Sequence, residues 1–293
     1  MLLQQIFNAL VLGSVYALFA LGFTLTFGVL KVINLLYGFY FAAGAFGALV
    51  AVQGLGLGLW PAAALGVVVA GLAAVVCDSL VLTPLRRAHA PELSSLIVTL
   101  GGVLLMNSLM QMAFGAEVRR FPVSLLGQEP MRLGPLVVAP LQVVIVATAL
   151  VLVAALFLVI ERTRLGAAIR AIAERPDTAA LMGVDVTRVV TLVSFVSAAL
   201  AGAAGILIGL NFNAVHPYMG EPMMLRGFAV IIIGGLGDIR GALVAGLGLG
   251  FLEVMTAGYV SSNLKEAVAF SALILALWLR PSGLFARASG RRA

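Results

Sequence analysis

A charged interval interrupts an otherwise apolar sequence at residues 161–188, which read ERTRLGAAIRAIAERPDTAALMGVDVTR. The interval holds five of the 18 Lys and Arg residues and four of the 12 Asp and Glu residues. Apolar runs long enough to cross a membrane flank it on both sides. A chain that exposes so little to water offers few places for polar contact. We therefore expect a soluble partner to dock on this interval.

Isolated polar side chains inside the apolar runs are the candidates for a solute pathway. Asn34 and Tyr37 stand near the start of the second run, Asn107 and Gln111 lie on the fourth, and Asn213 follows the sixth. Asn107 and Gln111 are four residues apart and therefore share one helical face. Such a face either lines a solvated path or forms hydrogen bonds with a neighbouring helix, and both interpretations remain open.

Two carboxylates, Asp78 and Glu253, fall within or near apolar runs, where an ionisable group raises a question of function. Asp78 lies about two turns before Arg86 and Arg87, so we expect its side chain to reach the membrane interface. Glu253 lies toward the outer end of its run, and both a functional and a structural role remain open there.

Several classes of chemistry lack the residues they need. The two histidines, His89 and His216, stand at the ends of apolar runs, and Cys77 is the single cysteine. A proton relay, an intramembrane protease and a metal site would need such groups within the spans. We therefore expect no catalytic residues, no metal and no proton-driven mechanism.

The composition predicts an all-α, polytopic membrane protein. Hydrophobic residues make up 62% of the chain, and the mean hydropathy is +1.14. Backbone within lipid must satisfy its own hydrogen bonds, which favours helices. The net charge of +6 comes from basic residues in short loops, so it predicts membrane orientation rather than nucleic-acid binding. We expect one domain over residues 1–293.

We predict eight or nine transmembrane segments. Their expected bounds are 6–30, 33–53, 60–82, 93–113, 136–160, 189–210, 223–237, 240–258 and 264–280. The seventh is too short to cross about 30 Å of hydrocarbon. Gly234, Gly235 and Gly237 are expected to break the helix there, before the next segment begins.

Loop charges predict the orientation. With the N-terminus outside, thirteen basic residues fall inside: Lys31, Arg86, Arg87, Arg162, Arg164, Arg170, Arg175, Arg188, Arg240, Arg280, Arg287, Arg291 and Arg292. Five fall outside, namely Arg119, Arg120, Arg132, Arg226 and Lys265. Because cytoplasmic loops are enriched in Lys and Arg, we predict an outside N-terminus, an inside C-terminus and an odd number of crossings.

The charged interval itself predicts two short helices. Residues 163–174 carry one apolar stripe at helical spacing, formed by Leu165, Ile169 and Ile172. Pro176 and Asp177 are typical of a helix start, and Gly183 is typical of a helix end. From these residues alone, a surface-lying amphipathic helix and a docking element both remain open.

The sequence resembles the permease subunits of branched-chain amino acid ABC importers, most closely the first of the two paired permeases. The resemblance rests on FGVLKVINLLYGFYFAAGAF (27–46), RTRLGAAIRAIAERPDTAALMGVDVTRV (162–189), SAALAGAAGIL (197–207) and IIIGGLGDIRGALVAGLGLG (231–250). It implies a non-enzymatic transport subunit in a bacterial inner membrane. It also implies a second permease, two ATP-binding subunits and a periplasmic binding protein as partners.

The resemblance further implies that the charged interval contains coupling helices that seat on the ATP-binding subunits. The positions carried over are Arg164, Gly166, Arg170, Glu174, Pro176, Asp177, Gly183 and Asp185. The chain has no P-loop, so ATP would be bound by the partners and no cofactor by this chain. A self-sufficient secondary transporter or channel, with sodium coupling through carbonyls and hydroxyls, is the alternative, and a structural scaffold is a third interpretation.

One motif departs from the family. Members commonly read Asn-Phe-Ala-His-Gly after the first span, whereas this chain reads Asn34-Leu35-Leu36-Tyr37-Gly38. Related systems move urea, short amides or aromatic acids, so the resemblance leaves the substrate open between these and branched-chain amino acids.

Overall fold

The structure is a computed structural model that describes residues 2–88, 91–122, 131–133, 136–280 and 283. Its helices are α1 (Leu2–Leu30), α2 (Tyr37–Leu55), α3 (Leu59–Cys77), α4 (Thr83–Arg87), α5 (Glu92–Phe114), α6 (Pro140–Arg162), α7 (Arg164–Glu174), α8 (Pro176–Leu181), α9 (Val186–Phe212), α10 (Gly220–Gly234), α11 (Ile239–Tyr259) and α12 (Lys265–Leu279). A π-helical turn, η1 (Asp78–Leu82), joins α3 to α4, and a short 3₁₀ turn, η3 (Ser262–Leu264), precedes α12.

Eight helical stretches in the described part of the chain are long and apolar enough to cross a membrane. The prediction of a polytopic, all-α membrane protein is therefore confirmed. Each of the nine predicted segments contains a helix, and the short one, α10, has 15 residues and is not among the eight. A helix of that length rises only about 22 Å, less than the hydrocarbon thickness.

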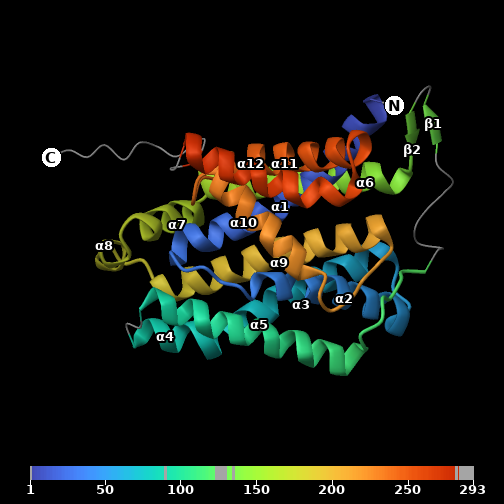
Figure 1. Ribbon diagram of the computed structural model, residues 1–293. Helices are drawn as coiled ribbons and strands as arrows, with labels where there is room; N and C mark the ends of the chain where they lie inside the picture. The colour runs from blue at the N-terminus through green and yellow to red at the C-terminus, as the bar shows by residue number, and fades with distance from the viewer. Residues whose placement is uncertain (1, 89–90, 123–130, 134–135, 281–282, 284–293) are drawn as a thin grey trace.

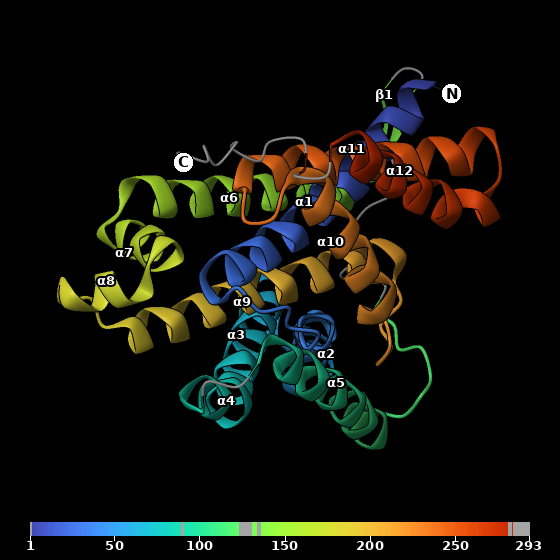
Figure 2. The ribbon, with the colours of Figure 1, turned by 60° about the vertical axis from the view of Figure 1, so that its left-hand side comes forward.

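In the view of Figure 1 the long helices run roughly along one direction, whereas Figure 2 shows them crossing at various angles; α1 lies near the centre of the bundle in both views. Helix α1 packs most extensively against α11, while α2, α3 and α9 form a second tightly packed group. A Cβ at Gly250 of α11 would collide with the backbone of Gly13 in α1. Small residues thus allow the close backbone approach on which membrane bundles depend.

The bundle has two distinct ends (Figure 1). The first, called the α8 end here, carries α4, α7 and α8 together with the turn between α10 and α11. The second, called the hairpin end, carries the start of α1 and the antiparallel pair β1 (Met131–Leu133) and β2 (Leu136–Val138). Gly283, beyond α12, approaches Gly235 at the α8 end. The start of α1 and Gly283 therefore lie at opposite ends of the bundle.

The fifth predicted segment, 136–160, begins too early. Residues Leu136–Val138 form strand β2, and helix α6 starts only at Pro140. Proline suits the first helical position because its missing N–H has no partner there in any case. The Gln142 side chain also accepts a hydrogen bond from the backbone N–H of Ala139, which fixes this start. The apolar run concealed the hairpin because strand and helix are equally hydrophobic here.

Candidate functional site

Helix α7 is attached firmly to the bundle. Thr163 caps it by accepting a hydrogen bond from the backbone N–H of Gly166 at 3.1 Å. Ile169 and Ile172 are buried in the main core cluster, and Leu165 packs against that cluster at its edge. The predicted helix and its apolar stripe are thus confirmed, and the stripe faces the bundle rather than the solvent.

Helix α8 follows after a break at Arg175 and begins with Pro176 and Asp177, as predicted. It ends at the predicted glycine, because Gly183 has φ 84° and the N–H of Val184 donates to the carbonyl of Ala179. This left-handed closure is the usual end of a helix at glycine. The carboxylate of Asp185 then accepts a hydrogen bond from the N–H of Arg188 at 3.0 Å and so caps α9.

The eight predicted coupling residues fall into two groups. Four are solvent-exposed residues, namely Arg164, Glu174, Pro176 and Asp177. The other four shape the segment: the guanidinium of Arg170 donates to the carbonyl of Ile160, Gly166 lies against that same residue, and Gly183 and Asp185 set the turns. Their role toward a partner remains a prediction.

Sequence reasoning missed the two residues at the tip of α8. Leu181 is 89% exposed and Met182 is 82% exposed, and both stand in a segment surrounded by charge. Large apolar side chains outside the membrane face are unusual and commonly mark a protein contact. Their place just before Gly183, off the buried stripe of α7, was the signal available in the sequence.

The glycine-rich break lies at the same end of the bundle. Helix α10 ends at Gly234, and Gly235 and Gly237 have φ 107° and 86°, which only glycine adopts readily. Asp238 caps α11 by accepting from the N–H of Gly241 at 2.8 Å. The predicted break is confirmed.

Asn34 and Tyr37 lie in the protein interior. The Asn34 side chain accepts a hydrogen bond from the backbone N–H of Leu36 at 3.0 Å. The Tyr37 hydroxyl donates to the carbonyl of Ser197 at 2.6 Å, and its ring stacks on Phe23 with 5.1 Å between centroids. Both residues therefore have well-defined packing roles, and their place on a pathway remains a prediction.

Asn107 and Gln111 face the start of α10 and the loop before it. The Asn107 amide donates to the Glu221 carboxylate at 3.1 Å, and the Gln111 carbonyl accepts from the Tyr218 hydroxyl at 2.8 Å. A largely apolar cavity of about 240 Å³ lies between α5 and α10, and Asn107 and Glu221 are among its lining residues. Of the five predicted pathway residues, Asn107 is therefore the one that lines this cavity.

Asn213 serves a different purpose at the hairpin end. Its backbone is left-handed, with φ 46°, and terminates α9. Its side-chain oxygen accepts from the backbone N–H of Phe121 at 2.8 Å. This residue ties the loop after α5 to the end of α9, away from Asn34 and Tyr37.

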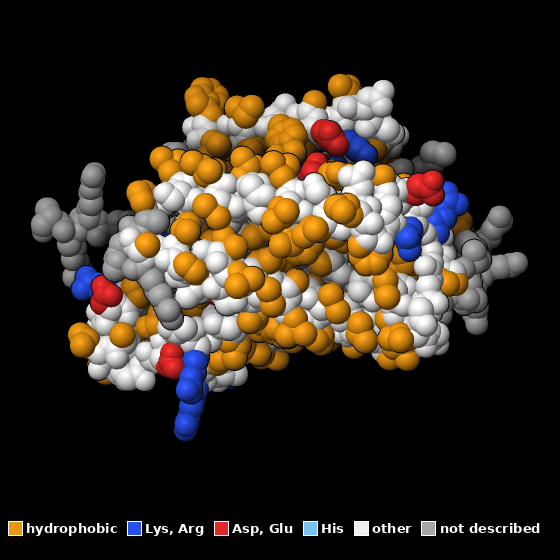
Figure 3. Space-filling model, turned by 90° about the horizontal axis from the view of Figure 1, so that it is seen from below, with side chains coloured by type: hydrophobic (Ala, Val, Ile, Leu, Met, Phe, Trp, Pro, Cys, Tyr) orange, Lys and Arg blue, Asp and Glu red, His pale blue; other side chains and the backbone are white. Residues whose placement is uncertain are grey.

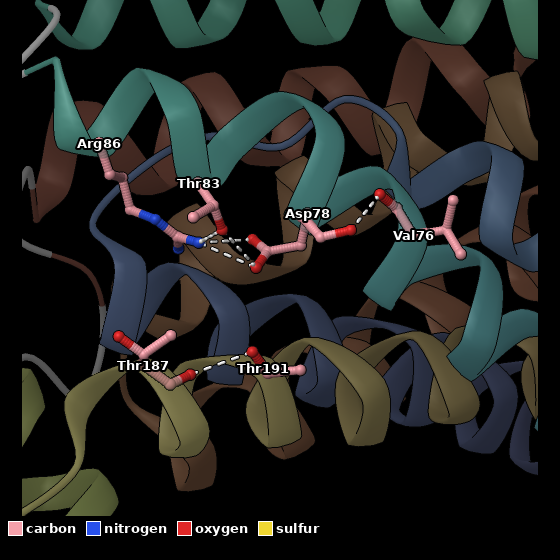
Figure 4. Close-up of polar contacts among 7 residues, drawn as sticks. Val76, Asp78, Thr83, Arg86, Thr187 and Thr191 are labelled. Carbon is pink, nitrogen blue, oxygen red and sulfur yellow. Dashed lines mark hydrogen bonds and ion pairs between the residues drawn. The ribbon is translucent and has the colours of Figure 1, made fainter.

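Two ion pairs among the described residues have a buried carboxylate, and the first lies close to the α8 end (Figure 4). Nη2 of Arg86 donates to both carboxylate oxygens of Asp78, at 2.9 and 2.8 Å, and to the hydroxyl of Thr83 at 3.0 Å. The Asp78 side chain is only 4% exposed. The prediction that Asp78 extends to the interface is therefore wrong, because Arg86 folds back across η1 to meet it.

The second ion pair belongs to a cluster of side chains from four helices. Nε of Arg226 in α10 donates to Oε1 of Glu253 in α11 at 2.7 Å, and the hydroxyl of Tyr16 in α1 donates to Oε2 at 2.6 Å. Arg226 also pairs with Glu266 of α12 at 3.3 Å. Arg226 was assigned to an outer loop, but it lies within α10 and its side chain is 16% exposed.

This second cluster borders a cavity of about 390 Å³, called the Arg226 cavity here. Its polar lining comprises Tyr16, His216, Arg226, Glu253, Lys265 and Glu266. Apolar side chains from α1, α2, α9, α10 and the loop before α10 complete the wall. Because His216 and the start of α12 contribute, the cavity lies toward the hairpin end. Burial lowers the pKa of His216 below its usual value, although Glu221 nearby opposes the shift.

Apolar and charged side chains occupy different parts of the molecular surface. On the face shown in Figure 3, apolar side chains cover the middle and charged side chains lie toward the edges. Within the described residues, no three His, Cys, Asp or Glu side chains gather as a metal site would require. The fold and its two ends together define a multi-pass membrane protein with polar cavities and a helix pair exposed at one end.

Comparisons with known proteins place the chain within that class. Residues 5–277 match the family described as branched-chain amino acid transport system / permease component. The chain belongs to this family. It is 30% identical over 297 residues to the high-affinity branched-chain amino acid transport system permease protein LivH of Escherichia coli K12, covering 97% of this chain and 96% of LivH.

Two further relatives agree. The LivH of Salmonella typhimurium and the high-affinity branched-chain amino acid transport system permease protein BraD of Pseudomonas aeruginosa are each 30% identical over 296 residues. Each alignment covers 97% of this chain and 96% of the relative. No solved structure gives a significant match. The resemblance predicted from the four motifs is confirmed over nearly the full length.

Proposed function

We propose that this chain is the membrane-spanning, non-enzymatic permease subunit of an ATP-binding-cassette importer. It moves branched-chain amino acids, or a related small polar solute, inward with energy from separate ATP-binding subunits. The family membership and the transport systems named for its relatives support the class. The exposed tip of α8 is the observation that carries the assignment, because Leu181 and Met182 present large apolar side chains that commonly mark a protein contact.

In this proposal the α8 end faces the cytoplasm of a bacterial inner membrane. Described basic residues at this end include Lys31, Arg86, Arg188 and Arg240. An excess of cations on one side favours a cytoplasmic location for that side. The hairpin end then faces the periplasm, where a substrate-binding protein would deliver the solute.

Coupling is assigned to the exposed surface of α8 and its neighbours. Leu181 and Met182 would insert into a groove on an ATP-binding subunit, while Asp177 and Glu174 would make polar contacts at the rim. Gly166 and Arg170 would hold α7 rigidly against α6, so that movement of α8 reaches the bundle. Closure of the ATP-binding dimer would then alternate access to a path between two permeases.

Transport by reconstituted vesicles tests this proposal. We expect leucine uptake only when both permeases, both ATP-binding subunits, the binding protein and ATP are present. A complex whose ATP-binding subunits bind but do not hydrolyse ATP should take up no more than vesicles without protein. Uptake by this chain alone, driven by a sodium gradient without ATP, would establish the secondary-transporter alternative and overturn the proposal.

A further inference from the structure

The Arg226 cavity contains charged groups whose bonding capacity is only partly used within the protein. Both carboxylate oxygens of Glu253 already have partners, Tyr16 and Arg226. Glu253 therefore acts as a positioning residue that fixes the guanidinium. Arg226 uses Nε and Nη2 for the two glutamates, and within the described residues its Nη1 makes no hydrogen bond.

Lys265 and Glu266 supply further free groups at the start of α12. Lys265 lines the cavity, and the described part of the chain contains no hydrogen bond or ion pair to its ammonium. Glu266 bonds Arg226 through Oε1 alone and is 61% exposed, so Oε2 is available. The cavity thus presents two unused cationic donors beside one unused carboxylate oxygen.

The net charge of the cavity lining indicates what charge a bound ligand should carry. Two cations, Arg226 and Lys265, face two carboxylates, Glu253 and Glu266, so the charged lining is formally neutral. An anion or a cation alone would leave one sign of charge uncompensated in a partly desolvated site, which is costly. A zwitterion satisfies both signs at once and leaves the balance unchanged.

The apolar part of the cavity wall indicates what kind of ligand side chain the cavity can accommodate. Apolar lining residues include Phe41, Ile208, Phe212, Met219 and Met223. Methionine is flexible and polarizable, so it adapts to branched aliphatic groups. A volume of about 390 Å³ lies within the usual size of small-ligand pockets.

We propose that the Arg226 cavity is a binding site for zwitterionic α-amino acids with apolar side chains. Lys265 and Nη1 of Arg226 bind the ligand's carboxylate, and Glu266 binds its ammonium. The site lies on the hairpin-end side and receives the solute before the bundle opens toward the α8 end. This inference rests on the proposed function for the substrate class and adds a location and contacts within the chain.

Equilibrium binding of radiolabelled L-leucine tests the site. The permease–ATPase complex is placed in nanodiscs without ATP and without the binding protein. Leucinol, which lacks the carboxylate, and 4-methylpentanoate, which lacks the ammonium, serve as competitors. We expect each to bind about tenfold or more weakly than leucine, because each loses a charge-assisted hydrogen bond.

Two variants separate the contacts. Lys265→Gln should weaken leucine about tenfold and bring the leucine-to-leucinol affinity ratio toward one. Glu266→Gln should instead reduce discrimination against 4-methylpentanoate. Glu117→Gln and Arg120→Gln remove exposed hairpin-end charges outside the cavity lining and should leave every ratio unchanged.

The outcomes are distinguishable. Wild-type affinity and ratios in both cavity variants would overturn the inference, and so would equal weakening of all three ligands, which would assign the cluster a structural role alone. ATP-driven leucine uptake by a complex that binds no leucine without its binding protein would refute this site and leave the proposed function standing. Absence of ATP-driven uptake would instead refute the proposed function.

Discussion

The two ends of the bundle expose different chemistry. At the α8 end, apolar Leu181 and Met182 project from a charged helix pair, while nearby ion pairs are either local or on the surface. Toward the hairpin end, charged side chains are drawn inward and surround a cavity. A protein partner binds through projecting apolar groups, whereas a small polar solute needs charges inside a pocket. The contrast indicates that one end suits a macromolecule and the other a solute.

The largest stability effect is expected from the buried ion pair beside the cavity. Glu253→Gln removes the main partner of Arg226 and leaves a largely buried guanidinium undercompensated, which should cost about 3–5 kcal/mol. The matched change at the α8 end is Glu161→Gln, whose partner Arg240 is 69% exposed. That surface pair should contribute about 1 kcal/mol or less.

Unfolding of the detergent-solubilised protein, followed by thermal or denaturant titration, measures both variants. If Glu253→Gln and Glu161→Gln lowered the free energy of unfolding equally, the energetic contrast between the two ends would be contradicted.

The attachment of α7 provides the second test. A Cβ at Gly166 would collide with the backbone at Ile160, so Gly166→Ala should displace α7 and cost about 1–3 kcal/mol. Gly248 in α11 has open space around its Cβ position, and Gly248→Ala should be neutral or slightly stabilising. Vesicle uptake should fall in the first variant and persist in the second. Normal uptake by Gly166→Ala would show that rigid attachment of α7 is dispensable.

Removal of the Asp185 cap at the start of α9 should lower the stability by a smaller amount. Asp185→Ala removes the hydrogen bond to the N–H of Arg188 and should cost about 1 kcal/mol. Asp185→Asn keeps an effective capping oxygen and loses only the exposed ion pair with Arg188, so it should retain most of the stability. Denaturation of the three proteins side by side distinguishes capping from charge, and an Asn variant as weak as the Ala variant would contradict the capping role.

The smallest effect concerns pH at the hairpin end. Because burial lowers the pKa of His216, the folded state binds fewer protons than the unfolded state between that lowered value and about 6.5. Stability should therefore fall as the pH drops through this window, and His216→Gln should weaken the dependence. Thermal unfolding at about pH 7.5 and about pH 5.5 measures it. An identical pH dependence in the variant would exclude His216 as the source.

Much of the helical framework follows from local signals. Runs of apolar residues predicted the nine segments, Gly234, Gly235 and Gly237 predicted the break, and Pro176 with Gly183 predicted α8. These signals act through neighbouring backbone geometry, so they can be read from the sequence. The hairpin at β1 and β2 was missed because its pairing depends on contacts between residues and not on local hydrophobicity.

The sites were harder to predict because they depend on long-range contacts. Tyr16, Arg226 and Glu253 come together only when α1, α10 and α11 pack, and nothing near Arg226 in the sequence identifies its partner. Asp78 was misplaced because η1 turns the helix so that Arg86 reaches back. Leu181 and Met182 were overlooked because their exposure depends on how α7 buries its own stripe.

The central claim is that the tip of α8 transmits energy from separate ATP-binding subunits. Substrate-stimulated ATP hydrolysis by the complete reconstituted complex tests it most directly. The double variant Leu181→Asp, Met182→Asp is compared with Val118→Asp, which places a single aspartate at an exposed hairpin-end position. We predict that the double variant inserts normally and loses about tenfold or more of the stimulated hydrolysis, while Val118→Asp retains it. Full stimulation in the double variant would contradict the account.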